Sequence, residues 1–362
     1  MCGLKSNREN KSPGSSPGLL HLEEFLERLF QWFANNRRDL PWRAEYAPYR
    51  VFVAEVMLAQ TQVPRVIPYY CRFLERFPDV FTLASASREE VLLAWEGLGY
   101  YRRAHHLHEA AQRIVEHFQG RIPADFRTLR RLPGIGPYIA SAILGIGYNL
   151  PVLALDTNVR RVLSRVFGAG EDVNLREIGN LLIARVPSGK ARHLNEALMD
   201  FGSLVCLSRK PRCSPCPFRE FCAFVKDARK ERRVQQQRVL LEMCVAVCCA
   251  GEGVLLTKSE GKLFPGLWGL PFREQDGEDP RAWIDALGKR YGFLPLALEE
   301  CGAVAHAYTR YRVRARVLRV SGKRTGMLSE AAWVAFRELF QYPLPSLFRK
   351  ALALGCPEEY RP

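Results

Sequence analysis

A single glutamate, Glu55, lies inside the otherwise almost wholly apolar stretch VFVAEVMLAQ at residues 51–60. Burying a carboxylate is unfavourable unless the group is paired with a cation or keeps its proton. Desolvation raises the pKa of such a carboxyl group, which then can act as a general acid near neutral pH. The alternative is a structural ion pair between Glu55 and a buried arginine. From this stretch alone, a structural ion pair is favoured, and a protonated carboxyl group with a chemical role remains open.

A second carboxylate, Asp156, lies in the segment LDTNVR at residues 155–160, just before an apparent helix. Taken alone, this position favours an ordinary helix N-cap, in which Asp156 or Thr157 contributes about 1 kcal/mol. The functional alternative is a carboxylate held beside a reacting centre, where it stabilises developing positive charge. Both interpretations of Asp156 remain open at this point.

Four of the 11 cysteines are clustered in the pattern Cys206-x6-Cys213-x2-Cys216-x5-Cys222. Four thiolates can bind zinc or an iron–sulfur cluster. Zinc ribbons usually contain two separated CxxC pairs, and only one is present here, so the unequal gaps favour a [4Fe–4S] cluster over zinc. The odd number of cysteines and the polar N-terminus, which does not read as a secretory signal, indicate a reducing compartment.

The segment LPGIGPY at residues 132–138 precedes an apolar helical stretch, IASAILGIG. The turn at Gly134 and Gly136 allows two helices to approach closely. Backbone N–H groups at the start of the following helix suit a DNA phosphate. Many helical pairs use glycine turns without binding anything, but this pattern predicts a helix-hairpin-helix at about residues 129–148.

The composition points to a polyanionic partner. The 362 residues include 53 Lys plus Arg and 38 Asp plus Glu, a formal charge of +15 with a pI near 9.5. Nucleic acid is the simplest partner for such a chain. Apolar runs are too short to span a membrane, so we expect no membrane association and a cytoplasmic location, with nucleoid association in a bacterium. Residues 1–18 are polar and rich in Ser, Gly and Pro, and we expect a disordered tail there.

The elements that must position these residues fall into two domains. Helical spacing of apolar residues over 19–225 predicts an all-α domain. A charged and Gln-rich linker follows at 226–238, and an α+β domain is expected over 239–350. We expect helices near 22–33, 51–60, 64–76, 87–95, 102–118, 137–148, 158–166, 175–185, 191–204 and 279–291, and strands at 239–249, 254–258 and within 303–320.

In combination, the motifs resemble the helix-hairpin-helix superfamily of base-excision DNA glycosylases, and within it the MutY-type adenine DNA glycosylases. The resemblance covers roughly residues 20–350 and also rests on EVMLAQTQV at 55–63 and GLGYY at 97–101. It implies that Glu55 protonates a flipped adenine and that Asp156 stabilises the oxocarbenium-like sugar. Superfamily members that also cut the strand carry a lysine where Tyr138 stands. Because a phenol cannot form an imine, the resemblance implies a monofunctional glycosylase.

The resemblance assigns further roles position by position. For Trp42 and Tyr100, core packing is the alternative. The implied roles are Tyr138 and Asn158 around the sugar and the catalytic water, Trp42, Arg43 and Glu196 in the adenine pocket, Gln60 and Tyr100 as wedges in the duplex, and Gly134 and Gly136 at the DNA backbone.

The segment FPGLWGLPF at residues 264–272 resembles the start of a Nudix-type fold. A Nudix hydrolase needs paired glutamates to hold Mg²⁺, whereas the matching positions here hold Lys289 and Arg290, so we expect binding without hydrolysis. Where the family commonly has a Phe-Ser-His loop for 8-oxoguanine, this chain has Tyr308-Thr309-Arg310. Where the family usually has glycine, this chain has Thr157, which would be strained if that position needs an unusual backbone angle.

The sequence therefore predicts a monomeric, [4Fe–4S]-containing adenine glycosylase that acts on double-stranded DNA with A:8-oxoguanine or A:G mispairs. Three alternatives remain. These are a pyrimidine-directed DNA glycosylase of the same superfamily, a lesion-binding protein with little turnover, and an electron carrier that uses the four cysteines.

Overall fold

The computed structural model describes residues 19–169, 172–226, 239–259, 263–264, 266–274, 279–307, 311–326 and 331–356. The expected tail at 1–18, and the expected linker apart from Lys226, lie outside these ranges. The chain forms two compact units, Met1–Val56 with Ile122–Glu231 and Met57–Arg121 with Arg232–Pro362. None of the helices in the described ranges is long and apolar enough to cross a membrane.

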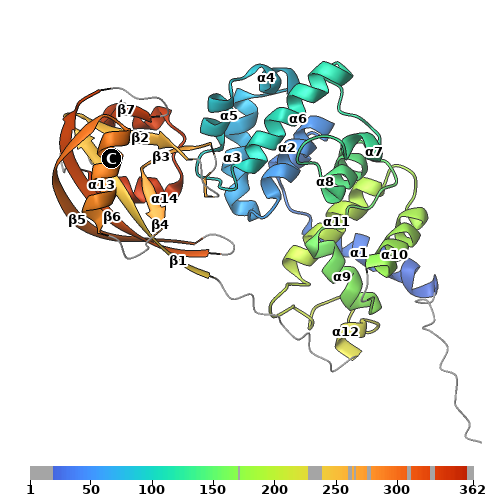
Figure 1. The fold of residues 1–362 in the computed structure, drawn as a ribbon. Coiled ribbons are helices and arrows are strands. Elements are labelled where there is room, and N and C mark those ends of the chain that lie inside the picture. The colour runs from blue at the N-terminus through green and yellow to red at the C-terminus, as the bar shows by residue number, and fades with distance from the viewer. Residues whose placement is uncertain are drawn as a thin grey trace, which may run out of the picture. The chain divides into compact units, whose positions relative to one another are not determined.

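All the regular elements in the described part of the first unit are helices (Figure 1). A π-helical turn continues α8 directly, so the two form one bent helix after the hairpin. The elements are α1 (Leu19–Asn36), η1 (Pro41–Arg43), α2 (Pro48–Leu58, which runs just past the end of this unit), α7 (Phe126–Leu129), α8 (Pro137–Ala142), η2 (Ile143–Gly147), α9 (Thr157–Phe167), α10 (Asp172–Arg185), α11 (Ala191–Leu204) and α12 (Ala223–Lys226).

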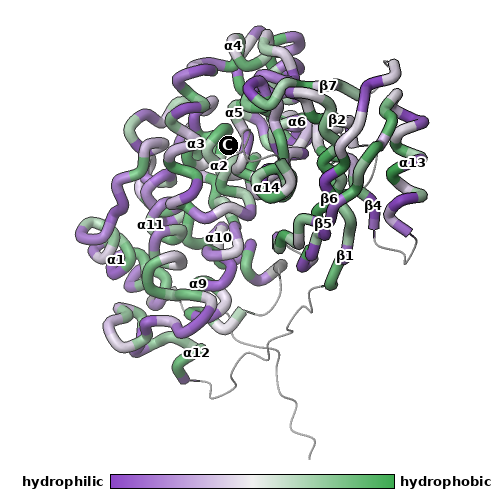
Figure 2. The backbone as a smooth tube through the Cα atoms, turned by 90° about the vertical axis from the view of Figure 1, so that its left-hand side faces the viewer, coloured by the Kyte–Doolittle hydropathy of each residue, from purple (hydrophilic) through white to green (hydrophobic). Residues whose placement is uncertain are grey.

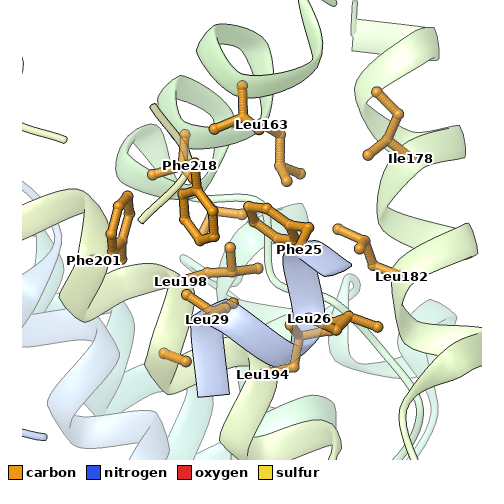
Figure 3. Packing of buried hydrophobic residues seen from close by; sticks show 14 of the residues in the cluster. Phe25, Leu26, Leu29, Leu163, Ile178, Leu182, Leu194, Leu198, Phe201 and Phe218 are labelled. Atoms are coloured by element: carbon orange, nitrogen blue, oxygen red, sulfur yellow. The ribbon is translucent and has the colours of Figure 1, made fainter. Parts of the chain in front are cut away.

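The core of this unit lies between α1, α9, α10 and α11 (Figure 3). Phe25 of α1 and Phe218 are both fully buried, and their ring centroids lie 4.5 Å apart. Phe218 belongs to the cysteine-rich segment between α11 and α12, so its burial fastens that segment to the core. Burying an aromatic side chain of this size contributes about 1.5–3 kcal/mol.

Helix α9 shows why this sequence forms a packed helix. Its tube carries both hydrophobic and hydrophilic residues (Figure 2), and the hydrophobic ones recur at helical spacing. Val159, Val162, Leu163 and Val166 are all buried in the core. One face of α9 is thereby held against α1 and α11, and the start of the helix is held in place with it.

The second unit begins with four helices, α3 (Val63–Arg76), α4 (Val80–Ser85), α5 (Arg88–Trp95) and α6 (Arg102–Phe118). Local capping sets where two of them start. The side chain of Asp79 accepts a hydrogen bond from the backbone N of Thr82 at 2.8 Å. Ser87 and Glu90 form a reciprocal capping box at the start of α5. Trp95 is fully buried and packs edge-on against Phe73 at 5.9 Å.

The remainder of the second unit is a seven-stranded sheet in the order β3-β2-β1-β6-β5, with β4 paired to β1 and β7 paired to β2. The β1–β6 pair is parallel and the other pairs are antiparallel. The strands are β1 (Val239–Ala250), β2 (Gly253–Lys258), β3 (Trp268–Gly269), β4 (Phe272–Glu274), β5 (Phe293–Ala307), β6 (Tyr311–Arg324) and β7 (Ala331–Ala335).

Two helices cover opposite faces of this sheet. Alternate residues of β1 explain the division, because side chains along a strand point to opposite faces. Val245 and Val247 share a core with Phe348 of α14 (Ser346–Gly355), whereas Cys248 shares a core with Ile284 of α13 (Pro280–Arg290). The 3-10 helix η3 (Phe336–Gln341) leads from β7 towards α14.

The expected helices and strands are present, with boundaries that differ by a few residues, and no strand precedes Val239 in the described ranges. Three differences stand out. Strand β5 begins at Phe293, well before residue 303. The helices α4, α7, α12 and α14 and the strands β3, β4 and β7 were not expected, and α14 extends past residue 350, where the second domain was expected to end. The first half of β5 contains Pro295 and lacks clear alternation, a sequence that an edge strand tolerates because one side of it is unpaired.

The close approach of Gly145 to a neighbouring segment generates a prediction about stability. A Cβ atom on Gly145 would lie 2.2 Å from the carbonyl oxygen of Val152 and 2.8 Å from Nδ2 of Asn195. We expect Gly145→Ala to lower the free energy of unfolding by about 1–3 kcal/mol, measured by urea denaturation. The control is Gly326→Ala, because nothing lies within 4 Å of a Cβ there and its φ is not positive, and its effect should stay within about 0.5 kcal/mol. Equal effects of the two substitutions would contradict this account.

Candidate active site

The hairpin brings Tyr138 into the interior of the first unit. Gly134 has a positive φ of 71°, and Gly136 is the N-cap of α8, followed by Pro137 in the first turn. The side chain of Arg130 holds the turn by donating from Nη1 to the carbonyl oxygen of Ile135 at 2.8 Å. Tyr138 therefore sits in the first turn of a helix whose start is well defined.

Glu55 lies on α2 and is 4% exposed. The phenol of Tyr138 donates a hydrogen bond to its Oε2 atom. Desolvation raises the pKa of Glu55 from 4.5 to about 7. The hydrogen bond from Tyr138 and the charge of Arg43 oppose this shift, and the charge of Asp156 adds to it. The Glu55 carboxyl group can therefore hold its proton near neutral pH, and desolvation, not an ion pair, is the main influence on its pKa.

Asp156 serves as the N-cap of α9 and is also part of the same site. Its Oδ1 accepts a hydrogen bond from the backbone N of Val159 at 2.6 Å, and its Oδ2 accepts one from Nδ2 of Asn158 at 3.0 Å. Burial raises the pKa of Asp156, and these hydrogen bonds oppose that shift by favouring the charged form. The charge of Asp156 raises the pKa of both Glu55 and Tyr138. The three groups therefore lie close enough to influence one another, and Asp156 is a helix cap as well as a candidate site residue.

The segment that leads to Asp156 is held by a buried amide that sequence reasoning missed. Asn195 on α11 is fully buried and uses both ends of its side chain. Its Oδ1 accepts from the backbone N of Ala154 at 2.7 Å, and its Nδ2 donates to the carbonyl of Val152 at 2.9 Å. A polar residue on the apolar face of α11 was the available signal in the sequence.

Asn158 is held by a second residue that the sequence did not single out. Nη2 of Arg161 donates to Oδ1 of Asn158 at 2.7 Å and to the carbonyl of Gly202 at 2.6 Å. Nε of Arg161 donates to the carbonyl of Cys206 at 2.7 Å. A Cβ on Gly202 would approach that of Asn158 to 2.7 Å, so α11 and α9 cross closely here. Arg161 thereby links the start of α9 with the start of the cysteine-rich segment.

Thr157 does not carry the backbone strain that its replacement of a family glycine suggested. It is the first residue of α9, and it is not among the residues with positive φ. A β-branched residue is compatible with that conformation.

Arg43 and Glu196, expected in a base pocket, are in contact. Nε of Arg43 lies 3.1 Å from Oε1 of Glu196, and the phenol of Tyr46 donates to the same oxygen at 2.7 Å. The two guanidinium nitrogens of Arg43 donate to Asp200 at 2.8 and 3.0 Å. Asp200 is fully buried on α11 and was missed by sequence reasoning, because α11 carries several other polar residues. Trp42 is 8% exposed, which fits the core-packing alternative as well as a pocket wall.

Gln60 and Tyr100 belong to the second unit and both lie in exposed turns. Tyr100 is 42% exposed, which argues against core packing as its role. Both residues have positive φ, 67° for Gln60 and 52° for Tyr100.

The four clustered cysteines carry free thiols. Burial raises the pKa of Cys216 to about 11, and the other three thiols add to that shift, which places all four in one neighbourhood. In the described ranges, however, no group of three or more His, Cys, Asp or Glu side chains is arranged to hold a metal ion. The donor set suits an iron–sulfur cluster chemically, and the arrangement of these side chains does not by itself form a metal site.

The expected lesion loop, Tyr308-Thr309-Arg310, lies outside the described residues. It connects β5 and β6, which are paired along nearly their whole length. Lys289 and Arg290 lie in the last turn of α13.

Comparison with known proteins places these features in a family. A model of the HhH-GPD superfamily base excision DNA repair protein matches residues 53–186, and a NUDIX domain model matches residues 243–354. An adenine DNA glycosylase from Mycolicibacterium smegmatis is 42% identical over 192 residues, which is 52% of this chain and 66% of that protein. One from Buchnera aphidicola is 38% identical over 203 residues, 55% of this chain and 57% of that protein.

The solved structure of a thermostable thymine-DNA glycosylase is also similar, with 27% identity and a TM-score of 0.53 over 57% of this chain and 96% of that one. The chain spans about half the length of the curated relatives it matches. The expected fold, a helical glycosylase-type domain followed by a Nudix-like domain, is confirmed. The chain therefore combines an HhH-GPD superfamily base excision DNA repair domain at residues 53–186 with a C-terminal NUDIX domain at residues 243–354.

Proposed function

We propose that this protein is a monofunctional adenine DNA glycosylase that removes adenine mispaired with 8-oxoguanine or guanine in duplex DNA. The observation that carries the proposal is the buried Glu55 carboxyl, which accepts a hydrogen bond from Tyr138 and lies close enough to Asp156 to be influenced by its charge. The printed names of the curated relatives, adenine DNA glycosylases, support the same activity.

In this proposal the two carboxyl groups divide the chemistry. Glu55, with a pKa of about 7, donates its proton to N7 of the extruded adenine and so weakens the glycosidic bond. When that bond breaks, its electron pair leaves with the base and the sugar becomes an oxocarbenium-like cation. The hydrogen bonds from Val159 and Asn158 favour the ionised form of Asp156, which stabilises this cation. Water then adds to the sugar carbon and loses a proton.

The tyrosine at position 138 excludes cleavage of the DNA strand through an imine intermediate. Its phenol oxygen cannot form an imine with the sugar, so the DNA strand stays intact. The phenol also fixes one oxygen of Glu55 through its hydrogen bond. The Arg43–Glu196 pair, held by Asp200 and Tyr46, offers charged donors and acceptors for the edge of a purine.

For the four cysteines we propose a [4Fe–4S] cluster bound by Cys206, Cys213, Cys216 and Cys222. A bound cluster would cross-link the segment between α11 and α12. The chain itself fastens this segment through buried Phe218, through Arg161 at the carbonyl of Cys206 and through Arg165, whose Nη1 donates to the carbonyl of Leu207 at 2.7 Å. The partner is duplex DNA, in keeping with the charge of +15.

A pyrimidine-directed glycosylase is the second candidate, because the similar solved structure is that of a thymine-DNA glycosylase. Release of a pyrimidine from a mispair, and not of adenine, would decide for it. The Tyr308-Thr309-Arg310 loop is proposed to face the base opposite the adenine, on the resemblance alone.

The role of Glu55 is tested directly by the Glu55→Gln substitution. Gln cannot donate a proton to the base, so single-turnover release of adenine from an A:8-oxoguanine duplex should fall by about 10²–10⁴-fold. Duplex affinity, measured by fluorescence anisotropy, should stay within about twofold, since the shape of the side chain is retained. The control is Glu75→Gln on the exposed face of α3, which should release adenine at the normal rate. Normal release by the Glu55→Gln variant would exclude the acid role.

The burial of Glu55 also predicts a pH dependence of stability. Its pKa is raised on folding from 4.5 to about 7, so its contribution to stability is fully present below pH 4.5 and is lost as the pH rises to about 7. Relative to Glu55→Gln, which does not titrate, the free energy of unfolding of the unsubstituted protein should fall by about 3 kcal/mol between these limits. Urea denaturation of both proteins at pH 5 and pH 8 measures this difference. A difference that does not change with pH would show that Glu55 is not desolvated.

The cluster proposal predicts about four iron atoms and about four acid-labile sulfides per chain after anaerobic purification. Cys206→Ser should lower the iron content, whereas Cys71→Ser, at an exposed position outside the cluster, should not. Stoichiometric zinc in place of iron would overturn the assignment.

A further inference from the structure

The two residues proposed to wedge into the duplex share an unusual backbone conformation. The φ angles of Gln60 and Tyr100 are +67° and +52°. This left-handed region costs a residue other than glycine about 1–3 kcal/mol and persists only where the surroundings hold it. Both side chains are exposed. The question is therefore what holds these two turns.

Arg103 on α6 holds the turn that carries Gln60. Its Nη1 donates to the carbonyl oxygens of Met57 at 2.7 Å and Ala59 at 2.5 Å. Its Nη2 donates to Oγ1 of Thr61 at 3.0 Å. The guanidinium thus binds the chain on both sides of Gln60, at the end of α2, where helix carbonyls lack partners within the helix.

The same guanidinium holds the turn that carries Tyr100. Nη2 of Arg103 also donates to the carbonyl of Gly99 at 3.1 Å, and Nε1 of Trp95 donates to that carbonyl at 3.1 Å. The guanidinium carbon lies 5.2 Å from the ring centroid of Tyr100 and 5.4 Å from that of Trp95. One side chain therefore contacts both turns.

The contacts require the planar fork of an arginine. Burial lowers the pKa of Arg103 to about 10, so the group stays protonated at neutral pH. A lysine would keep the charge, but its single ammonium cannot direct parallel N–H groups at carbonyls in two different turns. The adjacent Arg102 has the same charge and is exposed, which provides a matched comparison.

We infer that Arg103 is a positioning residue that locks Gln60 and Tyr100 into one rigid element for extruding the target base. The inference rests on the proposed function, because the wedge roles of Gln60 and Tyr100, which the resemblance to MutY-type glycosylases implies, presuppose an enzyme that extrudes a base from duplex DNA. Extrusion of a base costs a few kcal/mol. A loosened wedge therefore lowers the extruded fraction of bound DNA, and with it the rate of release, more than it lowers duplex affinity.

The test compares Arg103→Lys with Arg102→Lys in two assays. Base extrusion is followed by the fluorescence of 2-aminopurine placed at the target position, in a Glu55→Gln background that prevents release. Single-turnover adenine release is measured with Glu55 intact. We expect Arg103→Lys to lose most of the fluorescence rise and to release adenine about tenfold more slowly, which corresponds to about 1.4 kcal/mol. Arg102→Lys should behave like the unsubstituted protein in both assays.

A mutant cycle separates positioning from a general loss of structure. If Arg103 acts through the wedge, adding Arg103→Lys to a Gln60→Ala/Tyr100→Ala variant should slow release no further. An additive loss, or a normal fluorescence rise in Arg103→Lys, would overturn the inference. Thr61→Val, which removes only one of the hydrogen bonds, should give a partial loss in the same assays. The Thr61→Val variant therefore still tests the inference if the Arg103→Lys variant does not fold.

Failure of the proposed function would be recognised separately. In that case the unsubstituted protein would release no adenine, whatever the residue at position 103. Failure of the positioning role would leave adenine release intact in both the unsubstituted protein and Arg103→Lys.

Discussion

A carboxyl group among apolar side chains keeps its proton near neutral pH only while water is excluded from it. For Glu55 this exclusion depends on the packing of α2 against the helices that follow the hairpin. Val51 of α2 shares a small buried cluster with Ala142, Ile146 and Ala154. The same packing aims the phenol of Tyr138 at the carboxyl. A site that uses Glu55 as an acid therefore requires an intact helical core around it, and the hairpin has a structural duty besides any contact with DNA.

The opposite requirement applies to Asp156, which must be able to ionise although it is largely buried. The chain meets this requirement with hydrogen-bond donors. The backbone N of Val159 and the amide of Asn158 favour the charged form, and Asn195 and Arg161 hold the segments that present them. Two carboxyl groups in one site thus have different environments, one mainly apolar and one rich in donors. Such a contrast is how proteins assign an acid and a stabilising anion to neighbouring carboxyls.

Three arginines join segments that are distant in the sequence. Arg43 ties the turn after α1 to Glu196 and Asp200 on α11, Arg161 ties α9 to the cysteine-rich segment, and Arg103 ties two turns of the second unit together. The formal charge of +15 therefore does not all face solvent. Part of it is used internally, where the fork of donors satisfies backbone carbonyls and carboxylates.

Patterns among neighbouring residues were sufficient to predict much of the secondary structure of this protein. Helical spacing predicted most of the long helices, apolar runs and alternation predicted β1, β2, β6 and the end of β5, and a glutamate in an apolar helix drew attention to Glu55, because these signals reside in neighbouring residues. The first half of β5, the short strands β3, β4 and β7 and the short helix α4 were not predicted, since an edge strand with a proline and elements of a few residues show little periodicity. The ten-residue helix α14 was missed as well.

The roles of Asn195, Asp200, Arg161 and Arg103 were decided only by the tertiary structure. Each acts on segments tens of residues away in the chain, and an arginine or asparagine in a helix looks the same whether it faces water or a buried carbonyl. The sequence by itself determined which ionisable groups the protein can use, because their residue types and their apolar neighbours in the chain can be read from it directly. Only the fold decided which of those groups meet, because hydrogen bonds and desolvation depend on distances that no local pattern contains.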